Sequence, residues 1–370
     1  MASSDPVYRL YSSEISYFSQ KVRPAFRWKR APFVELLATT KASREVIGPR
    51  TGLAMIPVVV TPEDETWQDS SDILDALERR FPEPPLYPTT PAQRLAAYCI
   101  ELWTDEFLLI PGVHWRWSYP ESATKALAEF AANMGSKGGA DRFAGAVQNF
   151  TRMIGVQEQT IPAIEAHTHD TLAALEAHFA VHPYLLGGHP SLADCALMGP
   201  FYGHFYNDAV PGRLLRETAP RTCHWIERMN HPGSDDVAGS WLADDEIAPT
   251  MRALLTVAGR DTAPIVLNNV RAFEEWVDTS PLTSGELPRI VGMHTSTFRG
   301  IEVERITLPY TSWMLQRVQG AYAALDGAGR ATVDRTLAGT GFDDILAYSP
   351  RHRVRRNPYK VELDRTTTTV

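Results

Sequence analysis

The side chains best suited to chemistry in this sequence are hydroxyls that stand where helices are expected to begin. Ser16 and Ser19 lie at the start of one helical pattern, and Ser70 follows Asp69 at the start of another. The first turn of a helix exposes unpaired N–H groups and carries a partial positive charge, so it favours a bound anion such as a carboxylate or a thiolate. A nearby hydroxyl can add a hydrogen bond to that anion.

Other reactive side chains give weaker signals. The cysteines are odd in number and far apart, which fits neither a disulfide framework nor a zinc site: Cys99, Cys195 and Cys223. Four histidines invite a metal interpretation, but their spacing does not suit one, and we expect solvated side chains: His167, His169, His178 and His182. We therefore expect no metal. The sequence also shows no glycine-rich phosphate loop, Ser-His-Asp signature or paired-carboxylate signature.

Composition limits the class of protein. The 370 residues are 44% hydrophobic and 22% charged, which is ordinary for a globular protein of two or three domains. A net charge of −8 argues against broad nucleic-acid binding. We see no apolar run of about 20 residues that would cross a membrane, and no secretory signal. We expect a cytoplasmic protein without nucleic-acid or membrane partners.

The first 86 residues predict a small α/β domain. Strands are expected at 7–11, 33–37, 56–60 and 66–68, and the turn-rich segment 61–65 makes the last two a hairpin. One helix should present Phe18, Val22 and Phe26 on a single face, and a second should begin at Asp69 or Ser70. Pro24 falls inside the first helical pattern, where it should cost about 3 kcal/mol or bend the helix.

A proline-rich linker at 82–88 separates this domain from a helical section. Helical patterns cover 91–110, 159–179, 192–206 and 220–230, and the third is apolar nearly all round, which indicates a buried helix. Ser191 and Asp194 have the spacing of a capping box at its start, a structural role.

A third section begins near Asp244. It shows helical patterns at 247–258, 264–277, 310–325 and 330–338, with a β-hairpin expected within 289–308. The basic run 351–356 is expected to be an exposed tail that contacts the chain's own acidic surface. We divide the chain into domains 1–86, 90–235 and 244–370, and we expect the last to pack on the helical domain because its helices are amphipathic.

Four features in this order resemble the soluble glutathione S-transferase superfamily over residues 7–232. They are Ser16-Tyr17-Phe18-Ser19 after the first strand, Ile56-Pro57 before the third, Gln68-Asp69-Ser70-Ser71 at a helix start, and Pro190-Ser191-Leu192-Ala193-Asp194 in the helical section. The resemblance implies an α/β plus all-α fold: a thioredoxin-like domain, a helical transferase-type domain, and here a mainly helical extension with a β-hairpin.

The resemblance assigns roles to two of these motifs. Pro57 would be a cis proline, and the Ile56 backbone would pair with the cysteinyl backbone of glutathione; the alternative is an ordinary trans proline at a strand start. Ser70 would hold the γ-glutamyl carboxylate, with Asp69 facing the α-amino group; the alternative is that Ser70 only caps its helix.

By the same resemblance, Ser16 takes the place of the catalytic serine or cysteine of the family. It would stabilise the thiolate, since lowering a thiol pKa by about 2 units needs only about 2.7 kcal/mol. The absence of cysteine at 16 and 19 argues against disulfide exchange. Tyr17 or Ser13 remain alternatives, as does the absence of any catalytic hydroxyl.

The implied activity is thiol transfer from glutathione, as co-substrate, to a small apolar electrophile, or a related elimination or isomerisation of the kind used in detoxification. Another small thiol could replace glutathione. The alternative is a non-catalytic glutathione-binding or interaction protein, because a fold does not fix a function. A homodimer is compatible with either. Six residues could line an acceptor pocket or belong to the core: His114, Trp115, Trp117, Tyr119, Tyr202 and Tyr206.

Overall fold

The computed structural model describes residues 7–232, 239–280, 282 and 285–365. The chain divides into two compact units, each built from separate stretches of the sequence. Unit 1 comprises 1–88, 115–148 and 176–242, and unit 2 comprises 89–114, 149–175 and 243–370. Three helices each contain a boundary between a stretch of one unit and a stretch of the other: α6 (Leu109–Trp117), α8 (Lys137–Met153) and α9 (Ile161–Phe179). The domain boundaries expected from the sequence remain a prediction.

Unit 1 contains a four-stranded sheet of thioredoxin-like type. Its strands are β1 (Tyr8–Ser12), β2 (Phe33–Leu37), β3 (Val58–Val60) and β4 (Thr66–Gln68), in the order β2-β1-β3-β4. β1 runs parallel to β2 and antiparallel to β3, which pairs antiparallel with β4. All three valines of β3 are fully buried, which explains their continuous apolar run. The predicted α/β domain is confirmed.

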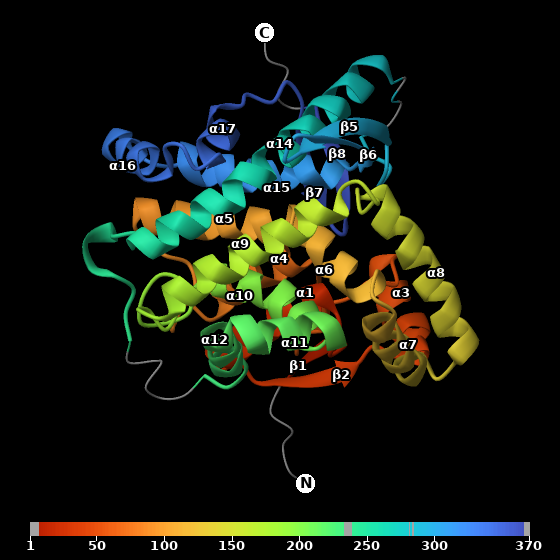
Figure 1. Cartoon of the computed structure of the whole chain (residues 1–370). Helices are drawn as coiled ribbons and strands as arrows, with labels where there is room; N and C mark the ends of the chain where they lie inside the picture. The colour runs from red at the N-terminus through yellow and green to blue at the C-terminus, as the bar shows by residue number, and fades with distance from the viewer. Residues whose placement is uncertain (1–6, 233–238, 281, 283–284, 366–370) are drawn as a thin grey trace. The chain divides into compact units, whose positions relative to one another are not determined.

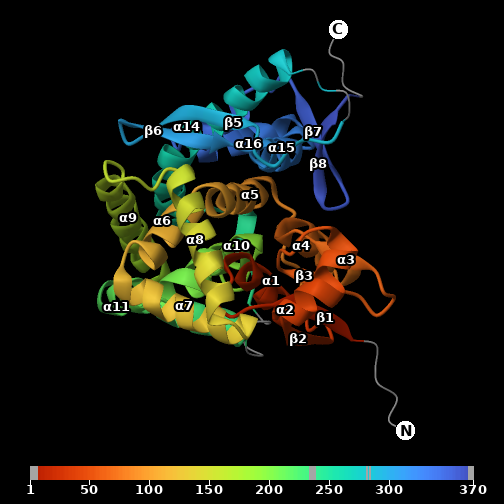
Figure 2. The ribbon, with the colours of Figure 1, turned by 90° about the vertical axis from the view of Figure 1, so that its right-hand side faces the viewer.

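Two helices connect this sheet to the rest of unit 1. α1 (Tyr17–Trp28) contacts both α4 (Ser70–Arg80) and α10 (Leu192–Pro200), as Figure 2 shows for α1 and α10. Val22 and Phe26 are fully buried, as expected for the apolar face of α1, whereas Phe18, expected on the same face, is partly exposed. The helix continues through Pro24. Short helical turns follow β2, namely α2 (Thr40–Ala42), the π-helical η1 (Ser43–Ile47) and α3 (Gly48–Thr51).

The helical part of unit 1 includes α7 (Pro120–Met134), α10, η2 (Phe201–Tyr206), α11 (Ala209–Thr218) and α12 (Pro220–Asn230). The capping box at the start of α10 is present, and all residues of this helix are buried, as expected. The single helix expected over 192–206 is wrong in one respect. The segment turns π-helical after Pro200, whose missing N–H interrupts the regular α-helical ladder.

Unit 2 is organised around α5 (Pro91–Glu106), which contacts α14, α15 and α16 (Figure 1). The carboxylate of Asp245 accepts the N–H groups of Ala92 at 2.8 Å and Gln93 at 3.0 Å, at the start of α5. The elements from residue 243 onward are η3 (Ala243–Asp245), α14 (Pro249–Thr279), β5 (Gly292–Phe298), β6 (Ile301–Thr307), α15 (Pro309–Ala323), α16 (Gly327–Leu337), α17 (Phe342–Ala347), β7 (Arg353–Asn357) and β8 (Lys360–Asp364).

The hairpin expected within 289–308 is confirmed as β5–β6. Two other expectations for this section are corrected. The patterns at 247–258 and 264–277 are one helix, α14, which continues through Pro264 because buried side chains line both halves. The basic run leads into a second hairpin, β7–β8, which sequence analysis did not predict. Its contact with the chain's own acidic groups is confirmed, since Arg351 and His352 both pair with Asp278.

Candidate functional site

The register of the sheet brings the predicted site segments to one end of it. Tyr11 of β1 pairs with Val58 of β3, which in turn pairs with Gln68 of β4. This row lies at the C-terminal ends of β1 and β4 and at the N-terminal end of β3. Past it, β1 continues into α1 and β4 continues into α4, while the segment before β3 arrives from the same side. The segments at these three adjacent strand ends are the ones singled out from the sequence: Ser16, Ile56-Pro57 and Asp69-Ser70.

Ser16 is the N-cap residue of α1 and is partly exposed. Its Oγ accepts hydrogen bonds from the Ser19 N–H at 3.3 Å and the Ser19 hydroxyl at 2.9 Å. The hydroxyl of Ser16 thus acts as an acceptor within the first turn, and its own hydrogen can be donated outward. The positive end of the α1 dipole lies at the same place. This geometry suits a hydroxyl that donates to an anion.

The two alternative hydroxyls lie in different surroundings. Ser13 is buried, and its Oγ accepts a hydrogen bond from Asn133 Nδ2 at 3.0 Å. Tyr17 is also buried, with its ring edge-on to that of His204 at a centroid distance of 5.2 Å. Ser16 is therefore the most exposed of the three candidates.

Asp69 caps α4 and adopts an unusual backbone conformation. Its Oδ1 accepts the Ser71 N–H at 3.0 Å, and its φ of 77° with ψ of 127° lies where residues other than glycine are strained. The N-cap residue of α4 is therefore Asp69, and the binding role of Ser70 stays a prediction. Ser70 is the first residue of α4 and is only 5% exposed. Behind it, Lys21 Nζ donates to Ser71 Oγ at 2.8 Å and joins α1 to α4.

The Ile56–Pro57 peptide bond is cis, as predicted, and Glu83–Pro84 is a second cis bond. Ile56 is partly buried, and the carbonyl of Met55 accepts a hydrogen bond from Gln68 Nε2 at 3.3 Å. The last residue of β4 thus holds the segment that enters β3. The pairing of the Ile56 backbone with glutathione stays a prediction.

Sequence analysis missed a charge cluster close to Ser16 in the chain, in which Arg23 is buried and Glu14 is exposed. Arg23 Nη2 lies 2.6 Å from Glu14 Oε2 and 2.8 Å from Glu35 Oε1, and the Tyr202 hydroxyl donates to Glu14. Burial opposes ionisation of Glu14, yet hydrogen bonds from Arg23 and Tyr202 hold the pKa of Glu14 below its usual value. Burial, and then the bond to Glu14, raise the pKa of Tyr202 to about 12, so this hydroxyl stays protonated at neutral pH.

The aromatic residues considered for an acceptor pocket are mostly packed. Trp115 stacks on Tyr119 with ring centroids 5.0 Å apart, and Trp117 stacks on Phe130 at 6.1 Å. Both tryptophans are buried, which favours the core interpretation for them. Three further residues have polar or ring partners of their own: Tyr202 and Tyr206 stack on each other, and His114 lies 3.1 Å from Glu165. The acceptor pocket stays a prediction.

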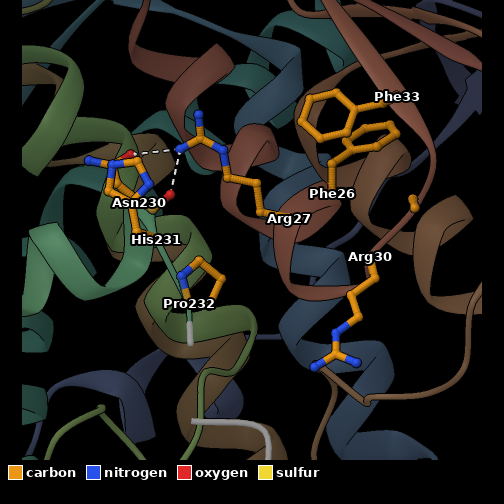
Figure 3. Close-up of a pocket in the computed structure, with 8 residues that line it drawn as sticks. Phe26, Arg27, Arg30, Phe33, Asn230, His231 and Pro232 are labelled. Carbon is orange, nitrogen blue, oxygen red and sulfur yellow. Dashed lines mark hydrogen bonds between the residues drawn. The ribbon is translucent and has the colours of Figure 1, made fainter. Parts of the chain in front are cut away.

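A pocket of about 450 Å³ lies at the opposite end of α1 (Figure 3). There Arg27 Nη1 donates to the carbonyl of Asn230 at 2.7 Å. With a rise of about 1.5 Å per residue, Arg27 stands about 16 Å along the helix from Ser16. The pocket contains none of the predicted site residues; its lining is Phe26, Arg27, Arg30, Ala31, Phe33, Asn230, His231 and Pro232.

The expectation of solvated histidines is wrong for two of the four, because His167 and His178 are fully buried. His167 Nδ1 lies 2.7 Å from Asp261 Oδ2, and His178 Nε2 lies 3.1 Å from the Tyr184 carbonyl. Asp261 is 94 positions away in the sequence, so no local pattern could reveal it. Across the described residues, no group of three or more histidine, cysteine, aspartate and glutamate side chains is placed to bind a metal ion. Within the same residues, no helix has the length and apolarity to cross a membrane.

Several solved structures match this chain at low sequence identity. A glutathione S-transferase from Rhodospirillum rubrum F11 is 20% identical, with a TM-score of 0.42 over 68% of this chain and 92% of its own. One from Methylobacterium radiotolerans JCM 2831, in complex with glutathione sulfonate, is 21% identical, with a TM-score of 0.40 over 65% and 99%. Beta-etherase LigF from Sphingobium sp. strain SYK-6 is 18% identical, with a TM-score of 0.45 over 67% and 98%. A search of curated proteins gave no match.

Two family models match the sequence in the order expected. The N-terminal domain of glutathione S-transferases matches residues 10–85, and their C-terminal domain matches residues 158–228. The first match includes every predicted site residue, and the second includes the Ser191–Asp194 capping box. Residues 244–370 lie outside both. With a thioredoxin-like sheet and a helical segment that match these two domains, the chain belongs to the glutathione S-transferase superfamily.

Proposed function

We propose that this protein is a glutathione-dependent transferase that joins the glutathione sulfur to a small apolar electrophile, or uses the same thiolate for a related elimination or isomerisation. The observation that carries the proposal is the row Tyr11–Val58–Gln68, which places Ser16, Ile56 and Asp69-Ser70 at adjacent strand ends. We place this activity in the cytoplasm and in a homodimer. Analytical ultracentrifugation would measure the mass of that dimer.

Each part of the thiol peptide has a partner in this arrangement. The N–H groups and the Ser70 hydroxyl at the start of α4 suit the γ-glutamyl carboxylate, and the Asp69 carboxylate suits the neighbouring ammonium group. The Ile56 backbone suits an extended cysteinyl residue. Ser16 donates its hydroxyl hydrogen to the sulfur, and the N-terminus of α1 adds its partial positive charge. Both effects favour the thiolate, which is the reactive form.

The test compares Ser70→Ala and Ser16→Ala by glutathione calorimetry and by pH titration of the absorbance of the bound thiolate. Ser70→Ala should weaken binding by about 1.5 to 3 kcal/mol, the usual scale of a hydrogen bond to a charged group. Ser16→Ala should leave binding of the neutral thiol nearly unchanged but raise the pKa of the bound thiol and lower turnover.

The matched control is Ser136→Ala, because Ser136 is an exposed serine whose Oγ likewise accepts an N–H in the first turn of a helix, from Gly139 at 3.1 Å. It should change neither measurement. Unchanged affinity in Ser70→Ala would remove the binding site from the proposal. An unchanged thiol pKa in Ser16→Ala would move the catalytic role to Tyr17 or Ser13, or to no hydroxyl. Binding by the parent with an unshifted thiol pKa would favour a non-catalytic glutathione-binding protein.

A further inference from the structure

A buried arginine binds the backbone of the residue that precedes Ser16. Arg116 of α6 is 2% exposed, and its guanidinium group makes hydrogen bonds in several directions. Nη1 donates to the carbonyl of Ile15 at 2.8 Å, and Nη2 donates to the carbonyl of Gly203 at 2.6 Å. Nε donates to Asp208 Oδ2 at 2.7 Å, and Nη1 also lies 2.9 Å from His204 Nε2. We call these five residues the Arg116 anchor.

The anchor joins two backbone segments that meet at the start of α1. Ile15 immediately precedes Ser16, and Gly203 belongs to the π-helical segment η2. The two segments are in close contact, because a Cβ added at Gly203 would lie 3.2 Å from the Cα of Tyr17 and 3.3 Å from the carbonyl oxygen of Ser16. Interruptions of regular helix of this kind often occur at functional sites. The guanidinium group thus holds η2 against the residue before the candidate catalytic hydroxyl.

We propose that Arg116 is a positioning residue for the thiol chemistry: by binding the carbonyls of Ile15 and Gly203 together, it fixes the backbone from which the Ser16 hydroxyl reaches the sulfur. This inference rests on the proposed function. Arg116 does not touch the thiol peptide in this scheme, and it acts only through Ser16.

The geometry requires arginine specifically. A guanidinium group is planar, stays charged and presents its N–H groups in a fixed fork, so one side chain can reach two carbonyls and a carboxylate at once. Lysine would keep the positive charge beside Asp208 but could not hold all of these acceptors in the same plane. Arg116→Lys therefore separates the effect of charge from the effect of position.

The test measures glutathione affinity by calorimetry, the pKa of the bound thiol by pH titration of thiolate absorbance, and the kinetics of conjugation to chlorodinitrobenzene as a probe electrophile. In Arg116→Lys, glutathione affinity and KM should stay within about twofold of the parent, while kcat falls about tenfold because the hydroxyl is misplaced. The pKa of the bound thiol should rise, as it should in Ser16→Ala. In the Ser16→Ala background, Arg116→Lys should have little further effect on the thiol pKa, because both act through one hydroxyl.

Asp208→Asn is the second variant, since it keeps an oxygen near Arg116 Nε but removes the charge. Asp208→Asn should also raise the pKa of the bound thiol and lower kcat, by smaller amounts. If Arg116→Lys does not fold, Asp208→Asn provides the test of the positioning role. The control is Arg213→Lys, whose parent arginine makes an exposed ion pair with Glu121. An unchanged thiol pKa and kcat in folded Arg116→Lys, or failing that in Asp208→Asn, would overturn this inference alone. A parent that binds no glutathione would overturn the proposed function, and this inference with it.

Discussion

His178 is a neutral histidine inside the folded chain. It is fully buried and lies 3.1 Å from the Tyr184 carbonyl, to which its ring N–H donates. Burial is the main cause that lowers the pKa of His178 to about 4, with a further contribution from nearby His182. The cost of protonating this side chain is therefore linked to the stability of the fold.

The pH dependence follows from the direction of this shift. Between pH 6.5 and about 4, the histidine of the unfolded chain binds a proton and the folded one does not, so stability falls as the pH falls. The matched variant is His178→Gln, whose side-chain amide can still donate to the Tyr184 carbonyl. When the pH is lowered from about 7 to about 4.5, the free energy of unfolding of the parent should fall by about 2 to 3 kcal/mol more than that of the variant. Urea unfolding at both pH values measures this.

Asp194 works in the opposite sense over part of the same range, because burial raises its pKa to about 6. It is present in both proteins, so the difference between parent and variant removes its effect. Equal losses of stability in the two proteins would show that His178 does not resist protonation in the fold.

The residues of the candidate site differ in how far the sequence reveals them. Ser16 and Asp69 carry local signals, because a hydroxyl or carboxylate before a helical pattern indicates a helix start. Arg116 gives no such signal. Its partners Ile15 and Gly203 lie 101 and 87 positions away, and only the folded chain brings them to one guanidinium group.

At the scale of elements, α10 depends on one carboxylate. Asp194 Oδ2 accepts the N–H and the hydroxyl of Ser191 at 2.9 Å, and Oδ1 accepts the N–H groups of Leu185 and Trp225 Nε1 at 3.0 Å. Its side chain therefore connects the helix start to the preceding turn and to α12. A capping box alone would contribute less than this arrangement.

Asp194→Ala should lower the free energy of unfolding by about 3 to 5 kcal/mol, since it leaves several buried donors without an acceptor. Glutathione binding per folded molecule should survive, because Asp194 is not one of the predicted site residues and its four hydrogen bonds go to Leu185, Ser191 and Trp225. Asp326→Ala is the control: Asp326 caps α16 through a single bond to the Gly329 N–H, and its loss should cost about 1 kcal/mol. Coincident unfolding curves for parent and Asp194→Ala would show that the box is dispensable.

Elements with a strong hydrophobic periodicity could be predicted from the sequence. Elements whose local sequence disfavours the structure that they adopt could not. The strands β2 and β4 match the expected ranges. α8 was missed because it opens with Lys137-Gly138-Gly139, and each glycine costs a helix about 1 kcal/mol relative to alanine. The β7–β8 hairpin was missed because its strands are largely charged, and its pairing depends on long-range packing against α15.

At the scale of the whole molecule, residues 244–370 are joined to α5 inside unit 2. Arg317 Nη2 lies 3.1 Å from Glu101 Oε2, with side chains only 7% and 1% exposed, and the Thr311 hydroxyl donates to Glu106 at 2.6 Å. Asp245 binds the first N–H groups of α5. Removing these residues would leave a buried carboxylate without its ion-pair partner, which typically costs about 3 to 5 kcal/mol.

We therefore expect fragment 244–370 to be insoluble or unfolded when made alone, and fragment 1–243 to be strongly destabilised. The two fragments produced together should reassemble, which serves as the control for damage caused by the cut itself. Circular dichroism and gel filtration of each fragment and of the pair measure this. A stable, soluble fragment 244–370 would contradict the expectation.

The division of unit 2 among distant stretches also has a consequence during synthesis. α5 is complete once residue 106 has been made, but its partners α14, α15 and α16 end at residues 279, 323 and 337. At about 5 to 20 residues per second, the ribosome needs roughly ten to fifty seconds to produce them. For that interval α5 lacks these three partners on the growing chain, whereas all four strands of the N-terminal sheet are already available for pairing. A chaperone that covers the apolar side chains of newly made α5 would therefore act before residue 337 has been made.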